Sequence, residues 1–278
     1  MSAWRIRDLL DKVEVQIADL SKFDSTAKAL ARFRPDVVAH LAWNGVQNTD
    51  RNAVEQWRNV PQVLELIECA HRVGVKTFVG LGSQAEYGRV TARIDEQTQM
   101  HPTTLYGMSK LAAGQLGAVV SQHFGMRFVW LRLFSSYGPG DNPGWMIPYL
   151  INTLLAGEYP KLTLAEQKWD YIFVKDVAAA IEAVIQSPSA HGFFNLGSGN
   201  ARPLRHIIEQ IRDLIDPGLP LGFGERPYRQ DQVMYLEADI SALNQATGWR
   251  PMWSYDDGLR ETIAWQRENS LDLNRERI

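Results

Sequence analysis

Four apolar runs, each too short for a helix, constrain the fold of this chain more than any other feature. They are rich in β-branched and aromatic residues and lie at Val37 to Ala42, Thr77 to Leu81, Arg127 to Phe134 and Phe193 to Leu196. Apolar residues recur at helical spacing between the first two, over Val60 to Ala70, and a second helical stretch, Tyr106 to Phe124, follows the second run. Buried strands that alternate with helices predict βαβ crossovers, so the fold class is α/β with a mainly parallel sheet.

The second half of the chain interrupts this alternation. Residues 138–144 are all Gly, Pro, Asp or Asn, and a short apolar helix is predicted at Met146 to Leu155. A return strand is expected at Tyr171 to Val174, followed by a helix that Asp176 caps and that ends at Ile185. A further helix is expected over Pro203 to Ile215. We therefore predict a smaller, interleaved lobe.

Charge and composition exclude several classes of protein. The 278 residues are 45% hydrophobic, and 29 Lys and Arg against 32 Asp and Glu give a net charge of -3. This composition is that of a folded globular chain, and its mildly acidic balance argues against binding to nucleic acid or to an anionic membrane. No apolar run approaches the ~20 residues of a membrane helix, so we expect a cytoplasmic protein. The single cysteine, Cys69, lies in an apolar helical stripe and is expected to be buried.

Tyr106 and Lys110 are four residues apart at the start of a predicted helix, so their side chains share a face. An ammonium beside a phenol lowers the pKa of the phenol from ~10, which lets tyrosine exchange a proton with a substrate hydroxyl or carbonyl. Found alone, this spacing more often means a packed tyrosine and a solvated lysine.

Ser83 strengthens the chemical interpretation. The strand that ends in Phe78-Val79-Gly80-Leu81-Gly82 delivers this serine to the carboxyl edge of the sheet, where open α/β sheets bind their ligands. A hydroxyl at that edge can hydrogen-bond the same substrate oxygen that Tyr106 protonates. His40 also lies at a strand end, but no Cys, His or carboxylate at metal-ligand spacing accompanies it, so we predict no metal site.

With these motifs the chain resembles the extended short-chain dehydrogenase/reductases, in their nucleotide-sugar epimerase, dehydratase and reductase branch. The matching pieces run almost end to end: Asp19, His40-Leu41-Ala42, Asn59-Val60, Ser83 through Gly88, the Tyr106/Lys110 pair, Arg132 through Pro139, Asp170 through Asp176, Asn195 through Gly199, and Gly248-Trp249-Arg250-Pro251. The resemblance implies a Rossmann-like sheet in a dinucleotide-binding domain of residues 1–140, 166–200 and 234–250. A substrate-binding lobe would comprise residues 141–165, 201–233 and 251–278.

The resemblance also implies roles for individual residues. Tyr106 would be the catalytic acid and base, Lys110 would lower its pKa and bind the nicotinamide ribose, and Ser83 would hold the reacting oxygen. The implied cofactor is NAD or NADP, with its adenine at Asp19 and Leu20 and its path lined by Leu41, Ala42 and Asn59. Alternatively, Asp19 is a turn residue at the end of a strand, and Asn59 is an amide on the surface of a helix.

The start of the chain departs from the family pattern. Family members begin with a strand, a glycine-rich turn and a helix that binds the cofactor pyrophosphate. Here residues 1–15 resemble the later helix and the entry to the third strand, and no glycine precedes Gly45. We hypothesise that the N-terminal glycine-rich βαβ is missing and that the chain as written binds dinucleotide poorly, which micromolar affinity for NAD or NADP in calorimetry would refute.

Other departures concern the substrate. Sugar 4,6-dehydratases of the family carry an Asp-Glu pair after the serine position, whereas Gln84 and Ala85 stand here and neither can act as acid or base. Ser135 replaces an asparagine that contacts the sugar diphosphate in many relatives and can still donate one hydrogen bond. Arg226 lies where relatives place an arginine that pairs with the pyrophosphate, although a solvated surface arginine is the alternative.

We expect a nucleotide-sugar epimerase or 4-ketoreductase that transfers hydride at C4 of a nucleotide-activated hexose. The alternative is a non-catalytic family member that acts as a ligand-binding or interaction protein. The family often forms homodimers through two helices, here Val60 to Ala70 and the Tyr106 helix, but a buried helix face fits packing within one chain equally well.

Overall fold

The computed structural model describes residues 6, 9–19, 23–228 and 232–275. The chain forms two compact units, residues 1–86 with 102–130 and residues 87–101 with 131–278. The predicted division into a dinucleotide-binding domain and a substrate lobe rests on the family resemblance, and it stays a prediction.

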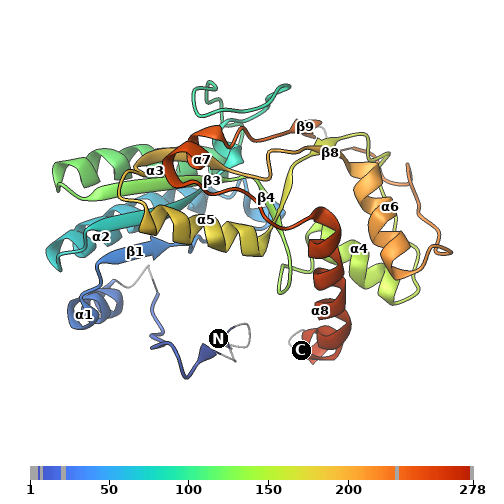
Figure 1. Cartoon of the computed structure of the whole chain (residues 1–278), viewed down its shortest axis with the longest axis horizontal. Helices are drawn as coiled ribbons and strands as arrows, with labels where there is room; N and C mark the ends of the chain where they lie inside the picture. Colours follow the sequence, from blue (N-terminus) through green and yellow to red (C-terminus); the bar gives the residue numbers. More distant parts are fainter. Residues whose placement is uncertain (1–5, 7–8, 20–22, 229–231, 276–278) are drawn as a thin grey trace. The chain divides into compact units, whose positions relative to one another are not determined.

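Parallel strands form the centre of the first unit (Figure 1). β1 (Val37–His40) pairs in parallel with β2 (Thr77–Ser83), with Val37 opposite Thr77 and His40 opposite Gly80. β3 (Arg127–Leu133) follows β2 in the strand order and continues into the second unit, where β7 (Gly192–Leu196) is next to it. All four predicted strands are confirmed to within two residues at either end, and the α/β fold class with them.

The helices of the first unit cover this sheet. They are α1 (Asp24–Phe33), α2 (Asn59–Arg72) and α3 (Leu105–His123), with the short 3-10 helices η2 (Asn48–Asp50), η3 (Val54–Arg58) and η4 (Gln84–Glu86). The two predicted helices are confirmed as α2 and α3, which pack against each other. Cys69 is buried in α2, as its apolar surroundings predict.

The predicted entry to a strand at Val15 is wrong. Residues 14–19 contain neither helix nor strand, so Asp19 does not follow a strand. Val15 is 46% exposed and Ile17 82% exposed. A strand is stabilised by a paired neighbour, and the described pairing of β1 is with β2 alone. Part of the predicted helix over residues 1–15 lies outside the described residues, namely 1–5, 7 and 8, and residues 9–15 contain no α-helix.

The second unit contains five further helices and several short strands. The helices are α4 (Met146–Leu155), α5 (Val174–Gln186), α6 (Leu204–Ile215), α7 (Ser241–Thr247) and α8 (Tyr255–Arg275). The remaining strands are β4 (Ser135–Tyr137), β5 (Lys168–Trp169), β6 (Tyr171–Phe173), β8 (Arg202–Pro203) and β9 (Tyr235–Leu236). β4 pairs in parallel with β6, and β5 lies between β8 and β9. The predicted helices at 146–155 and 203–215 and the return strand at 171–174 are confirmed.

One apolar core holds α4, α6 and α8 together (Figure 1). Leu150, Ile151, Ile211 and Leu259 are fully buried within it, and apolar side chains from β4 and β6 pack against the same cluster. Burying a large aliphatic side chain stabilises a fold by about 1.5–3 kcal/mol. The amphipathic patterns of the three helices therefore dictate how this end of the unit packs.

Asp176 does not cap α5 as predicted. The helix begins at Val174, so Asp176 lies inside its first turn, where its carboxylate oxygens accept the N–H groups of Met252 at 2.9 Å and Trp253 at 3.2 Å. The aspartate thereby attaches α5 to the segment that precedes α8. Sequence position alone does not distinguish a cap of its own helix from an acceptor for another segment.

Candidate active site in the first unit

Ser83 is fixed at the carboxyl end of β2. Its side chain is buried, and its hydroxyl oxygen accepts the N–H of Ala85 at 3.2 Å in the tight turn of η4. The predicted position of Ser83 at the edge of the sheet is therefore confirmed. Gln84, which follows directly, is half-buried in the same turn.

The first turn of α3 lies against this turn. Thr104 caps the helix, and its hydroxyl oxygen accepts the N–H of Gly107 at 3.1 Å. A Cβ on Gly107 would lie 2.3 Å from the carbonyl oxygen of Ala85, so only glycine allows this approach. The close packing brings the Ser83 hydroxyl near the phenol of Tyr106.

Tyr106 lies among cationic and aromatic groups. Its N–H donates to the carbonyl oxygen of Arg51 at 2.9 Å, and the Arg51 guanidinium carbon lies 5.5 Å from the centre of its ring. Burial raises the pKa of Tyr106 above its ordinary value, while the hydrogen bond from Ser83 and the charge of Arg51 oppose this shift. The direction differs from the lowered pKa that the sequence predicts, because the loss of hydration outweighs the nearby positive charge. Tyr106 is consequently a proton donor at neutral pH.

Lys110 lies one turn further along α3 and is 4% exposed. Its Nζ donates to the carbonyl oxygen of Leu81 at 2.6 Å and lies 3.9 Å from the ring centre of Trp43 and 6.0 Å from that of Tyr106. Burial lowers the pKa of Lys110 to about 7, and the charge of Glu86 opposes this. Lys110 is therefore a buried group beside the phenol. It is not the solvated lysine that this spacing more often indicates when it is found alone.

The side chain of Asn59 forms hydrogen bonds within the protein. Its side-chain oxygen accepts the N–H of Asn44 at 2.9 Å, and its amide nitrogen donates to the carbonyl oxygens of Asn44 at 3.2 Å and Gln56 at 3.1 Å. The amide thus fixes the segment that follows β1. Its predicted contact with a cofactor stays a prediction.

The other predicted cofactor residues lie directly after β1 or before it in the sequence. Leu41 is 51% exposed and Ala42 is exposed directly after the strand, while Leu20 falls outside the described residues. Asp19 is exposed and takes part in a polar interaction. His40 is buried, and burial together with the charge of Lys110 lowers its pKa to about 4, so the imidazole is neutral.

Sequence reasoning missed Trp43 and Gln56. The indole of Trp43 packs edge-on against Tyr106, with ring centres 6.1 Å apart, and donates to the side-chain oxygen of Gln56 at 2.9 Å. Gln56 in turn donates to the carbonyl oxygens of Gly45 and Asp50. The two residues are 13 positions apart, between the first predicted strand and the helix that begins at Val60, and no motif in the sequence joins them.

The predicted substrate residues Ser135 and Arg226 belong to the second unit. Ser135 is half-buried, and its hydroxyl accepts the indole N–H of Trp169 at 2.8 Å. Arg226 is exposed, and its guanidinium carbon lies 5.5 Å from the ring centre of Tyr149. Neither placement tests whether the residue contacts a substrate.

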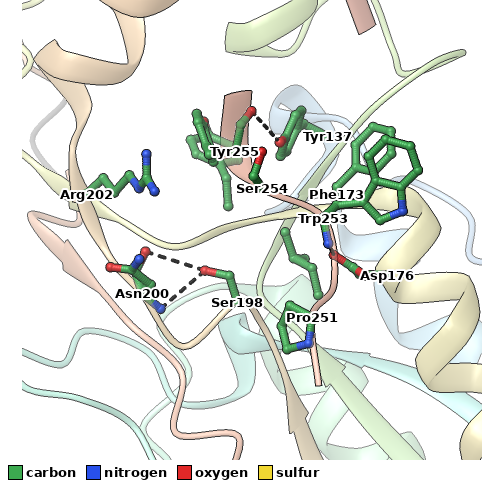
Figure 2. A pocket seen from close by; sticks show the side chains of 12 residues that line it. Tyr137, Phe173, Asp176, Ser198, Asn200, Arg202, Pro251, Trp253, Ser254 and Tyr255 are labelled. Atoms are coloured by element: carbon green, nitrogen blue, oxygen red, sulfur yellow. Dashed lines mark hydrogen bonds between the residues drawn. The ribbon is translucent and has the colours of Figure 1, made fainter. Parts of the chain in front are cut away.

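The second unit also contains a cavity of about 270 Å³ beside the start of α8, and neither Ser135 nor Arg226 lines it (Figure 2). Tyr137 donates from its hydroxyl to the carbonyl oxygen of Tyr255 at its wall, and Arg202 and Asp176 lie at opposite sides of it. Asp176 is already engaged by two N–H donors, and the guanidinium carbon of Arg202 lies 5.0 Å from the ring centre of Tyr255. The polar groups of this wall therefore serve the packing of α5 and α8.

Comparison with known proteins places the chain in a family. Residues 2–197 match the sequence model of the NAD dependent epimerase/dehydratase family. The chain belongs to this family. Its members are epimerases and dehydratases of nucleotide sugars that depend on NAD or NADP, in agreement with the resemblance seen in the sequence.

Individual relatives agree with this assignment. An uncharacterized UDP-glucose epimerase of Bacillus subtilis, YtcB, is 28% identical over 237 residues, which cover 83% of this chain and 74% of that protein. The structure of UDP-glucose 4-epimerase from Thermus thermophilus in complex with NAD has a TM-score of 0.81 at 25% identity, covering 93% of this chain and 87% of that one. RMD from Pseudomonas aeruginosa, complexed with NADPH, shares the fold with a TM-score of 0.84 at 24% identity, covering 95% of both chains.

None of the described helices has the length and hydropathy to cross a membrane. Within the same residues, no group of three or more His, Cys, Asp or Glu side chains is arranged to hold a metal ion.

Proposed function

We propose that this family member is an NAD(P)-dependent epimerase or 4-ketoreductase that transfers hydride at C4 of a nucleotide-activated hexose. The observation that carries the proposal is the convergence of three groups in the first unit. The Ser83 hydroxyl lies close enough to the Tyr106 phenol to oppose the rise of its pKa, and the Nζ of the buried Lys110, one helical turn along, lies 6.0 Å from the ring centre of Tyr106. A hydroxyl, a phenol and an ammonium around one point suit proton transfer to a carbonyl or alkoxide oxygen.

Each side chain has a distinct task in this proposal. Tyr106 gives its proton to the C4 oxygen during reduction, or takes it during oxidation, and Ser83 orients that oxygen with a hydrogen bond. Lys110 stabilises the phenolate that remains after Tyr106 has donated its proton. Because burial keeps the resting phenol protonated, the first unit is prepared for the reductive direction.

The residues present fit the nicotinamide end of a dinucleotide. The Lys110 ammonium has three N–H donors and uses one on the carbonyl of Leu81, so others are available for a ribose hydroxyl beside Tyr106. The bound nicotinamide would supply or accept the hydride. Leu41, Ala42 and Asn59 are proposed to line the cofactor path, with Asp19 and Leu20 at the adenine.

The turn after Ser83 supports hydride transfer without dehydration. Gln84 offers an amide and Ala85 a methyl group, and neither side chain exchanges protons as an acid or base. Elimination of water from a 4-keto sugar needs such a group, whereas reduction and epimerisation do not. We propose that Gln84, Ser135 and Arg226 bind the nucleotide-sugar substrate, with Arg226 on its pyrophosphate.

An assay with a panel of nucleotide-activated 4-ketohexoses and either NADH or NADPH tests this function. Where the chain binds NAD or NADP, turnover is expected, and Tyr106→Phe is expected to lower kcat at least about 100-fold while leaving the circular dichroism spectrum unchanged. The matched control, Tyr159→Phe, removes an exposed phenol of the second unit. Near-normal turnover by Tyr106→Phe would remove the phenol from the mechanism. Absence of turnover and of ligand binding across the panel would instead support a non-catalytic family member.

A further inference from the structure

Glu86 is a fully buried acid at the candidate active site for which the proposed reaction has no task. η4 turns back directly after β2, and Oε1 of Glu86 accepts the N–H of Ser83 at 2.9 Å and the indole N–H of Trp130 at 3.0 Å. A carboxylate without water is costly unless hydrogen bonds compensate for its lost hydration. The two N–H donors therefore make this a built position for a negative charge.

Three glycines make room for the donor indole. A Cβ on Gly82 would lie 2.3 Å from Nε1 of Trp130 and 2.5 Å from Oε1 of Glu86. A Cβ on Gly80 would lie 2.4 Å from the Trp130 ring, and one on Gly114 2.8 Å from its Nε1. Contacts this short do not occur between real atoms, so β2 and α3 both leave space for Trp130. The contact between Trp130 and Glu86 thus depends on residues of three separate elements.

The charge of Glu86 acts on the catalytic pair. Lys110 has neutral groups as its direct partners, the carbonyl oxygen of Leu81 and the ring of Trp43. The negative charge of Glu86 raises the pKa of Lys110 against the effect of burial, and it also raises the pKa of Tyr106. Glu86 therefore favours the protonated form of both side chains.

We infer that Glu86 is a positioning residue. Its carboxylate holds the turn that presents Ser83 to Tyr106, and it supplies the negative charge that keeps the buried Lys110 ammonium beside the phenol. This inference rests on the proposed function, but the part that concerns charge can be measured without turnover.

The first test measures the titration of Lys110 by nuclear magnetic resonance of its ¹³Cε group, assigned by its loss in Lys110→Arg. Glu86→Gln keeps the shape and removes the charge, and the midpoint for Lys110 is expected to fall by about one pH unit. Glu68→Gln, which removes an exposed carboxylate from α2, is expected to leave the midpoint unchanged. An unchanged midpoint in folded Glu86→Gln would overturn the inference.

A second variant covers the case in which Glu86→Gln does not fold. The variant Trp130→Phe keeps both charges and removes the indole donor, so the midpoint for Lys110 is expected to stay close to that of the unaltered chain. A fall of about one pH unit in this variant would show that the indole, and not the charge of Glu86, sets the midpoint, and would overturn the inference.

The second test separates positioning from a merely structural role. In Glu86→Gln the alkaline limb of the pH profile of kcat is expected to move to lower pH, with KM for the sugar changed less than twofold. A structural defect would instead lower the rate equally at every pH, and that result would overturn the role of the charge. If the unaltered chain shows no turnover at all, the proposed function fails, while the titration of Lys110 still tests Glu86.

Discussion

At the scale of single residues, burial has more effect on the candidate site than the charges do. The ammonium of Lys110 and the phenol of Tyr106 are both poorly hydrated, and the loss of water is the largest cause of both pKa shifts. It moves them in opposite directions, because it disfavours the charged form of each group. At neutral pH the site therefore contains a protonated phenol beside a lysine that is close to losing its proton.

The pH dependence of turnover follows from this. The pKa of Lys110 is lowered to about 7, so the ammonium is complete below that pH and is lost as the pH rises through it. If the ammonium stabilises the phenolate, kcat should fall above pH 7 by up to about tenfold per pH unit. Lys110→Arg keeps a positive charge at every accessible pH and should remove this alkaline limb. A flat profile between pH 7 and 9 in the unaltered chain would contradict the role of Lys110.

At the scale of secondary-structure elements, the glycines of β2 leave room for the Trp130 side chain. Gly82→Ala would place a methyl group on Trp130 and Glu86, in a strand with no room for it. We expect the free energy of unfolding to fall by about 1–3 kcal/mol, the usual cost of overpacking. Urea denaturation measures this, with Gly144→Ala as the control because its Cβ would meet only the Asn142 side chain. Equal stability of the two variants would show that the indole moves aside.

At the same scale, Asp176 attaches α5 to the segment before α8. Asp176→Ala would leave the N–H groups of Met252 and Trp253 without their acceptor. We expect a loss of about 1–3 kcal/mol in the free energy of unfolding, because a buried charged acceptor is removed. Asp213→Ala on α6, whose side chain is 53% exposed, serves as the control in the same urea titration and should change little.

Elements with a strong pattern were predictable from the sequence, and contacts between elements were not. The strands at Val37 and Thr77 were found because short apolar runs leave few other options, and Ser83 followed from the end of its strand. Glu86 was not found, because its role depends on an indole donor 44 positions away in the sequence. The strand at Val15 was expected from the family resemblance, although a strand also needs a paired neighbour.

At the scale of the whole molecule, the proposed functions are divided between the two units. Ser83, Tyr106, Lys110 and Glu86 all belong to the first unit, whereas the proposed substrate contacts Ser135 and Arg226 belong to the second. Substitutions in the second unit should therefore change KM and the choice of sugar more than the proton chemistry. The same division leaves the outer face of α3 unused by the chemistry.

That face carries an apolar stripe. Leu105, Met108, Leu116 and Val119 share one side of α3 and are 40%, 51%, 47% and 66% exposed. Exposed apolar groups in a row are costly in water and are typical of contact surfaces. We predict that a second copy of the chain covers this stripe, with α3 packed against its counterpart in a symmetric dimer.

Analytical ultracentrifugation tests this prediction. The unaltered chain is expected to sediment as a dimer, and the double variant Leu116→Glu with Val119→Glu as a monomer, because four carboxylates would have to share the interface without partners. Val54→Glu is the matched control, since Val54 is 67% exposed in η3 of the same unit and lies outside the stripe. The Val54→Glu variant is expected to remain a dimer. A monomeric unaltered chain, or a dimer that survives both charges on α3, would show that another surface is used.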